Sequence, residues 1–210
     1  MDFDDAQAYL NAHIDLEKTT AISAGHVAGL SLDRMRQVVD VLGAPQRDYP
    51  VIHITGTNGK GSTARMITAL LAAHQLSAGT YASPHLEHVT ERMSRNLEPI
   101  GPDELGRVVG ELATLEEQRF FAERPSYFEL LTAAAFSWFS QVAVDVAVVE
   151  VGLLGRYDAT NVADGQVAVV SNVGRDHTDG TGDWRRRIAD EKAGIVKPGC
   201  HLVLGEPDKD

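Results

Sequence analysis

The sequence contains a single cysteine, Cys200, in 210 residues, which excludes an internal disulfide and a cysteine-rich zinc site. It is also poor in basic residues: 19 Lys and Arg against 30 Asp and Glu give a formal charge of −11. A field of that sign repels nucleic-acid phosphates and anionic membranes. Polar residues interrupt the longest apolar stretch, residues 130–154, and three of the first five residues are acidic where a signal peptide is basic. We therefore expect a cytoplasmic protein with no nucleic-acid or membrane partner.

The residues that are present predict an α/β fold. Apolar residues make up 43% of the chain and charged residues 23%, a balance typical of a globular core. Short β-branched runs alternate with longer amphipathic stretches. The pattern predicts strands at residues 51–55, 79–82, 144–151, 166–173 and 202–204, and helices at residues 62–75, 105–119, 129–141 and 185–196. Strands separated by helices form a mostly parallel sheet flanked by helices, which binds ligands beyond the carboxyl ends of its strands.

A glycine-rich turn lies between the first expected strand and the first expected helix. Its residues are Thr57, Asn58, Gly59, Lys60, Gly61 and Ser62. Glycines let successive backbone N–H groups point at one anion, the helix start adds its positive end, and Lys60 adds a full charge. The spacing differs from the common G-x-x-x-x-G-K-[ST] loop, and an ordinary turn with a solvated lysine is the alternative. We interpret the turn as a phosphate-binding loop.

Polar residues also stand at the ends of three other expected strands. Ser83 follows the second strand, Glu150 ends the third, and His177 follows the fourth. A carboxylate at the end of a buried strand is costly unless a cation neutralises it. Beside a phosphate loop that cation would be Mg²⁺, and His177 would suit Mn²⁺ equally. The residues alone leave two alternatives open: Glu150 paired with a lysine or arginine, and His177 as an ordinary loop residue.

Seven motifs follow one another along residues 32–199. They are GTNGKGS at 56–62, SPHL at 83–86, ER at 91–92, EVGL at 150–153, DATN at 158–161, DHT at 176–178 and EKAGI at 191–195. Together they resemble the folylpolyglutamate synthase / dihydrofolate synthase branch of the Mur ligase superfamily. The resemblance implies an ATP-dependent amide ligase that is monomeric and uses ATP and two Mg²⁺ ions. A carboxylate of folate or dihydropteroate would take the γ-phosphate of ATP, and L-glutamate would attack the resulting acyl phosphate.

The resemblance also implies roles for individual residues. Residues 57–62 would hold ATP, and Lys60, His177 and Lys192 would be catalytic. Ser83 and Glu150 would bind one Mg²⁺ and His177 a second. Lys192 matches the lysine that family members carry as a carbamate, which would make it a metal-bridging anion; without the family it would be an ordinary helix-surface lysine. The stretches that match the pterin-binding segments are Ser126, Tyr127, Phe128 and Glu129, and Tyr157, Asp158 and Ala159.

Two departures from the family pattern bear on the fold and on the domain organisation. Family members commonly have glycine where this chain has Leu154, and a leucine predicts a negative φ at that position. The family also continues for about as many residues again. We therefore expect residues 1–210 to be a truncated N-terminal P-loop ATPase domain without the C-terminal glutamate-ligase domain, with weak or no ligation.

Two other functions fit parts of this pattern. A UDP-muramyl amino-acid ligase would use the same scaffold, but here Lys60 is followed by Gly61 and Ser62 rather than by two threonines. A non-catalytic nucleotide-binding module is the second alternative. Production of ADP during an ATP titration, with and without folate, separates it from a ligase.

Overall fold

The computed structural model describes residues 1–15, 31–175, 178 and 180–207. These residues form a seven-stranded sheet in the order β4-β3-β2-β5-β1-β6-β7. The strands are β1 (Val51–Thr55), β2 (Ala78–Tyr81), β3 (Met93–Arg95), β4 (Glu98–Pro99), β5 (Val146–Glu150), β6 (Val167–Val170) and β7 (His201–Leu204). The helices are α1 (Phe3–Asn11), α2 (Asp33–Val41), α3 (Lys60–Ala73), α4 (Pro102–Glu117), α5 (Tyr127–Gln141) and α6 (Trp184–Ala193), with short 3₁₀ turns η1 (Pro45–Arg47), η2 (Val89–Arg92) and η3 (Ala159–Val162). The predicted α/β class is confirmed.

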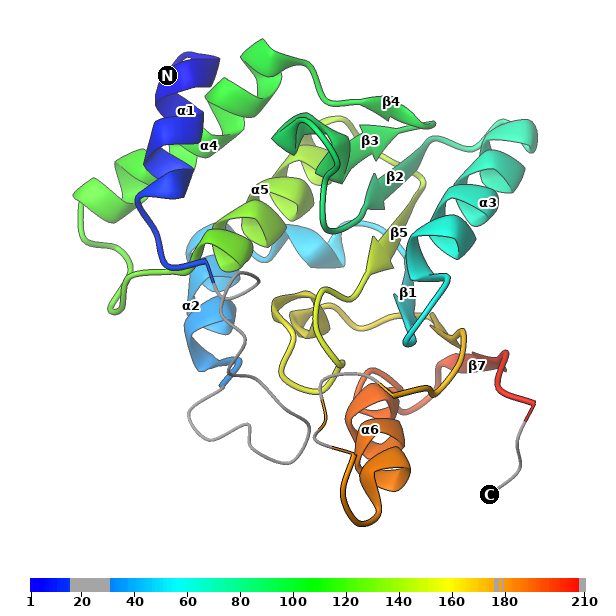
Figure 1. Cartoon of the computed structure of the whole chain (residues 1–210). Coiled ribbons are helices and arrows are strands. Elements are labelled where there is room, and N and C mark those ends of the chain that lie inside the picture. The colour runs from blue at the N-terminus through cyan, green and yellow to red at the C-terminus, as the bar shows by residue number, and fades with distance from the viewer. Residues whose placement is uncertain (16–30, 176–177, 179, 208–210) are drawn as a thin grey trace.

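Five of the strands run parallel, as the sequence predicts. β1 lies between β5 and β6, β2 pairs with the other side of β5, and β7 pairs with β6. The parallel strands therefore end at one edge of the sheet (Figure 1). The antiparallel strands β3 and β4 extend the sheet beyond β2 and were not predicted.

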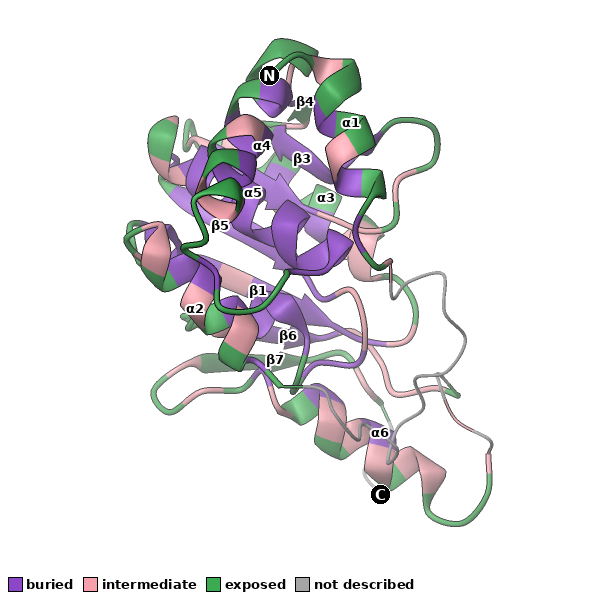
Figure 2. Ribbon diagram, turned by 90° about the vertical axis from the view of Figure 1, so that its left-hand side faces the viewer, coloured by how far each residue is buried: buried purple, intermediate pink, exposed green. Residues whose placement is uncertain are grey.

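Helices cover both faces of the sheet. α3 lies on one face, α1, α2, α4 and α5 lie on the other, and α6 lies beyond the carboxyl ends of the strands (Figure 1). Every residue from 127 to 139 of α5 is buried, because this helix lies between the sheet and the outer helices (Figure 2). None of the helices in the described ranges is long and apolar enough to cross a membrane.

The helix after the phosphate loop differs from the prediction. α3 begins at Lys60, two residues before the expected start, and ends at Ala73. Its periodicity places Met66 and Leu70 on the apolar face, but these side chains are 60% and 65% exposed. The buried residues of α3 are Ala64 and Thr68, which are small enough for the helix to lie close to the strands.

Candidate nucleotide and metal site

The phosphate loop joins the carboxyl end of β1 to α3. Gly56 and Gly59 have φ of +148° and +78°, a region that glycine adopts without steric cost. Lys60 is the first residue of α3, and its Nζ donates to the carbonyl of Gly56 at 3.0 Å. The lysine side chain therefore folds back over the loop, with its charge beside the backbone that the sequence predicts to bind phosphate.

The loop is held against the segment that follows β6. The Asn172 Oδ1 accepts from the Asn58 N–H at 3.0 Å, and the Ser171 Oγ donates to the Asn58 carbonyl at 2.7 Å. A Cβ on Gly56 would lie 1.8 Å from the Ser171 Oγ, so this approach requires glycine. Ser171 and Asn172 were missed in the sequence, although both directly follow an apolar strand, as the predicted site residues do.

Glu150 ends β5 and faces the phosphate loop. Its side chain is buried, and its Oε2 accepts from the Ser83 N–H at 3.3 Å. A Cβ on Gly61 would lie 3.3 Å from the same oxygen, so the glycine that separates this loop from the common pattern leaves room for the carboxylate. Burial raises the pKa of Glu150 to about 7, against the opposing effect of the nearby Lys60 charge. The loop, Ser83 and Glu150, which the sequence predicts to belong to one site, therefore lie side by side in the structure.

The donors at this point fit a divalent cation that also binds phosphate. A buried carboxylate favours a cation at its side, and Mg²⁺ is usually held by one or two protein oxygens together with phosphate oxygens and water. The described residues contain no group of three His, Cys, Asp or Glu that would hold a metal on their own. Glu150 and the hydroxyl of Ser83 would therefore share the cation with the nucleotide. His177 lies outside the described residues.

Lys192 lies on α6, and its side chain is 1% exposed. The alternative of an ordinary helix-surface lysine is therefore wrong. The loop after β5 holds this part of α6: the Arg156 N–H donates to the Glu191 carbonyl at 2.9 Å. A Cβ on Gly155 would lie 2.7 Å from that carbonyl. The close contact links the helix of Lys192 to the strand that carries Glu150.

The expectation of a negative φ at Leu154 is wrong, because Leu154 adopts a φ of +59°. The Thr55 Oγ1 donates to the Leu154 carbonyl at 2.6 Å, and the buried Leu154 side chain packs with Ile188 of α6. A left-handed conformation costs a non-glycine residue about 1–2 kcal/mol. The hydrogen bond and the buried side chain offset that cost, so leucine holds the left-handed conformation at this position.

The first predicted pterin-binding stretch begins α5. Ser126 and Glu129 form a capping box, in which the Ser126 Oγ accepts from the Glu129 N–H and the Glu129 Oε2 accepts from the Ser126 N–H. The same Oε2 accepts from the Arg34 Nε at 2.7 Å. Tyr127 and Phe128 are buried. These contacts stabilise the start of the helix, and contact of this stretch with a substrate stays a prediction.

The second predicted pterin-binding stretch is tied to the centre of the sheet. Asp158 is buried, and its carboxylate accepts from the N–H groups of Leu153 at 2.8 Å and Thr160 at 3.0 Å. The Thr160 hydroxyl donates to Asp158 and accepts from the His53 Nε2 of β1. Burial lowers the pKa of His53 to about 3, so this histidine is neutral. Within the stretch, Tyr157 is 40% exposed and Ala159 is buried.

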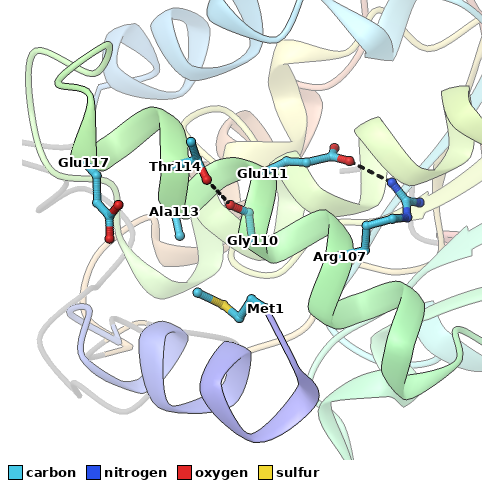
Figure 3. Close-up of a pocket in the computed structure, with 7 residues that line it drawn as sticks. All are labelled: Met1, Arg107, Gly110, Glu111, Ala113, Thr114 and Glu117. Atoms are coloured by element: carbon cyan, nitrogen blue, oxygen red, sulfur yellow. Dashed lines mark hydrogen bonds and ion pairs between the residues drawn. The ribbon is translucent and has the colours of Figure 1, made fainter.

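A groove between α1 and α4 lies at the other end of the molecule (Figures 1 and 3). Its lining includes Met1 and Gly110 together with the ion pair of Arg107 and Glu111. None of the predicted site residues lines it.

The fold and the loop define a class: an α/β domain with a glycine-rich loop at the carboxyl end of β1 and a buried carboxylate beside it. Residues 54–201 match the Mur ligase middle domain, and the chain belongs to this family. The resemblance predicted from the seven motifs is confirmed.

The chain is similar to several dihydrofolate synthases and folylpolyglutamate synthases. It is 46% identical over 187 residues to the dihydrofolate synthase/folylpolyglutamate synthase of Mycobacterium tuberculosis, covering 85% of this chain and 38% of that enzyme. The crystal structure of the mycobacterial folylpolyglutamate synthase with ADP and AMPPCP covers 99% of this chain and 45% of its own, with a TM-score of 0.82 and 39% identity. The structure of a bifunctional folylpolyglutamate synthase/dihydrofolate synthase with Mn, AMPPNP and L-glutamate bound is also similar, with a TM-score of 0.83 and 33% identity. The match covers 99% of this chain and 47% of that chain. The chain thus spans less than half the length of these relatives.

Proposed function

We propose that this chain supplies the nucleotide- and metal-binding part of an ATP-dependent ligase that adds L-glutamate to folate or dihydropteroate. The observation that carries the proposal is the meeting of the phosphate loop with Glu150 and Ser83, where Gly61 leaves room for the buried carboxylate. The ligands named for the similar structures, nucleotide analogues, Mn and L-glutamate, support it.

The chain's groups suit an acyl-phosphate mechanism. An oxygen of the folate or dihydropteroate carboxylate attacks the γ-phosphorus of ATP, and ADP leaves with the electron pair of the broken bond. The amine nitrogen of L-glutamate then attacks the acyl carbon, phosphate leaves, and the nitrogen loses a proton. The N–H groups of residues 57–62 and the ammonium of Lys60 would hold the β and γ oxygens and neutralise their charge. A divalent cation, when bound, supplies further neutralisation of the same oxygens.

The metal ligands would come from separate elements. Ser83 and Glu150 would hold one Mg²⁺, and His177 a second, with Mn²⁺ able to replace either. The burial of Lys192 distinguishes it from a solvated surface lysine, and as a carbamate its side chain would be an anion that a cation stabilises. For the acyl substrate, the predicted contacts are Ser126, Tyr127, Phe128, Glu129, Tyr157, Asp158 and Ala159.

We propose that residues 1–210 correspond to the N-terminal P-loop ATPase domain of these ligases. The glutamate-ligase domain would lie in the part of the relatives that the chain does not match, so that the chain alone ligates weakly or not at all. Acyl phosphates hydrolyse readily, and a site between two domains excludes water. Monomeric state and cytoplasmic location stay predictions.

Lys60→Ala tests the assignment of the loop. In the full-length enzyme, loss of one preorganised donor is expected to cost roughly 3–4 kcal/mol of transition-state stabilisation in glutamate-dependent ADP release. In the chain itself, calorimetric titration should show AMPPNP bound roughly tenfold more weakly or worse. Arg65→Ala, an exposed cation on the same helix, is the control and should change little. A loss below tenfold in ADP release, with either dihydropteroate or a folate, would refute the assignment.

A further inference from the structure

The Glu91-Arg92 pair is a sequence motif that has no role in the proposed function. These two residues end η2, which follows the partly exposed segment of residues 82–88. That segment contains Ser83, the proposed metal ligand at the carboxyl end of β2. Leu86 is 92% exposed, so its side chain does not anchor the segment by apolar packing.

The carboxylate of Glu91 accepts hydrogen bonds from three consecutive backbone N–H groups. The donors are Leu86 at 2.8 Å, Glu87 at 3.0 Å and His88 at 2.7 Å. Hydrogen bonds to an ionised acceptor are stronger than those between neutral groups. They hold the pKa of Glu91 down to about 2, so the carboxylate is ionised throughout the neutral range. One side chain therefore fixes three successive peptide groups.

Arg92 holds the other end of the segment. Its carbonyl accepts from the Ala82 N–H at 2.9 Å, and its Nε donates to the His85 Nδ1 at 2.8 Å. The guanidinium is buried and lies 5.5 Å above the centre of the Tyr127 ring. Because arginine only donates, the His85 Nδ1 must accept, and the neutral ring carries its proton on Nε2.

We propose that Glu91 and Arg92 are positioning residues that hold residues 82–88 in the conformation that presents Ser83 to a divalent cation shared with Glu150. The inference rests on the proposed function, which requires that cation. Ser83 itself touches Glu150 through its N–H, and the backbone of residues 82–88 fixes the position from which its hydroxyl extends. If residues 82–88 are already ordered before the cation binds, binding does not have to supply the free energy of ordering them. The affinity for the cation is therefore higher.

Amide hydrogen exchange of Glu91→Gln tests the first half of the proposal. An amide has one acceptor oxygen and no charge, so it cannot replace a carboxylate that accepts three N–H groups through two oxygens. The amides of residues 86–88 should exchange roughly tenfold faster, and those of the sheet should be unchanged. Glu87→Gln is the matched control, because it removes the same charge from the same segment and leaves Glu91 in place. Unchanged exchange in Glu91→Gln would overturn the proposal.

Mn²⁺ affinity tests the second half. With saturating AMPPNP, electron paramagnetic resonance should show Glu91→Gln binding Mn²⁺ roughly five- to tenfold more weakly than the unaltered chain and Glu87→Gln. Affinity for AMPPNP in EDTA should stay the same, because residues 56–62 are untouched. Arg92→Lys keeps the charge but lacks the Nε donor, and it should weaken Mn²⁺ binding in the same direction. Should Glu91→Gln fail to fold, Glu91→Asp, with its shorter reach, should show both changes.

The outcomes separate this inference from the proposed function. Faster exchange in Glu91→Gln with unchanged Mn²⁺ affinity would mean that the pair only stabilises the segment, and it would overturn the inference. Failure of the unaltered chain to bind Mn²⁺ with AMPPNP would instead contradict the proposed function, and with it the metal-binding half of the inference.

Discussion

At the scale of single residues, Glu150 has the environment that most directly connects stability with function. Burial raises its pKa to about 7 from an ordinary 4.5. Between pH 4.5 and about 7, Glu150 holds a proton in the folded chain that it has released in the unfolded chain. The contribution of Glu150 to stability therefore falls as the pH rises through this window. A divalent cation competes with that proton, so metal affinity should rise over the same range.

Glu150→Gln isolates this effect. In EDTA, the variant should be more stable than the unaltered chain by about 2–3 kcal/mol at pH 8, because the glutamine stays neutral where the buried glutamate must ionise. The difference should vanish near pH 4.5. Urea unfolding at several pH values measures it, with the exposed Glu98→Gln as control. Parallel pH profiles for Glu150→Gln and the unaltered chain would contradict the account.

At the scale of elements, the loop after β5 joins the phosphate-loop strand to α6. Thr55 of β1 donates to the carbonyl of Leu154, and Arg156 donates to the carbonyl of Glu191. Gly155 lets the loop and α6 approach closely. These contacts connect β1 to the helix that carries Lys192.

Thr55→Val tests this connection. The substitution keeps the shape of the side chain but leaves the buried Leu154 carbonyl without its donor, which should cost about 1–3 kcal/mol. Urea unfolding measures the loss. Thr114→Val is the control, because the Thr114 hydroxyl donates to the Gly110 carbonyl one turn earlier on α4, at an exposed position where water can replace it. An equal loss of unfolding free energy in the two variants would show that the hydrogen bond to Leu154 contributes no more to stability than the exposed one.

The elements that the sequence predicted are those with a strong pattern. β1 and β5 were visible as runs of β-branched residues, and the site residues as polar groups that follow them. α1 buries only Ala6 and Leu10, too few positions to show a period. The β3–β4 hairpin turns through Asn96 and Leu97 with φ of 52° and 71°, and leucine gives no sign of a left-handed turn.

In the site, too, features that depend on a local pattern could be predicted from the sequence, and features that depend on packing between elements could not. That Glu150 is buried beside the loop followed from its place in an apolar strand. The contact of Gly61 with Glu150, and the capping role of Ser126 and Glu129, depend on how separate elements pack. Leu154 shows that tertiary contacts can impose a conformation that the residue alone disfavours.

At the scale of the whole molecule, the parallel sheet is what brings the site together. The phosphate loop, Ser83, Glu150 and Ser171 lie at the carboxyl ends of four different strands that end at one edge. The chain carries a formal charge of −11, so an anionic nucleotide needs local positive charge. Lys60, the start of α3 and a divalent cation at Glu150 would supply it.

Anomalous diffraction from crystals of the chain grown with Mn²⁺ and AMPPNP tests this account most directly. The account predicts a manganese peak bonded to the Ser83 hydroxyl, the Glu150 carboxylate and phosphate oxygens, with the phosphates against the N–H groups of residues 57–62. Manganese bound elsewhere, or phosphates held away from that loop, would contradict it.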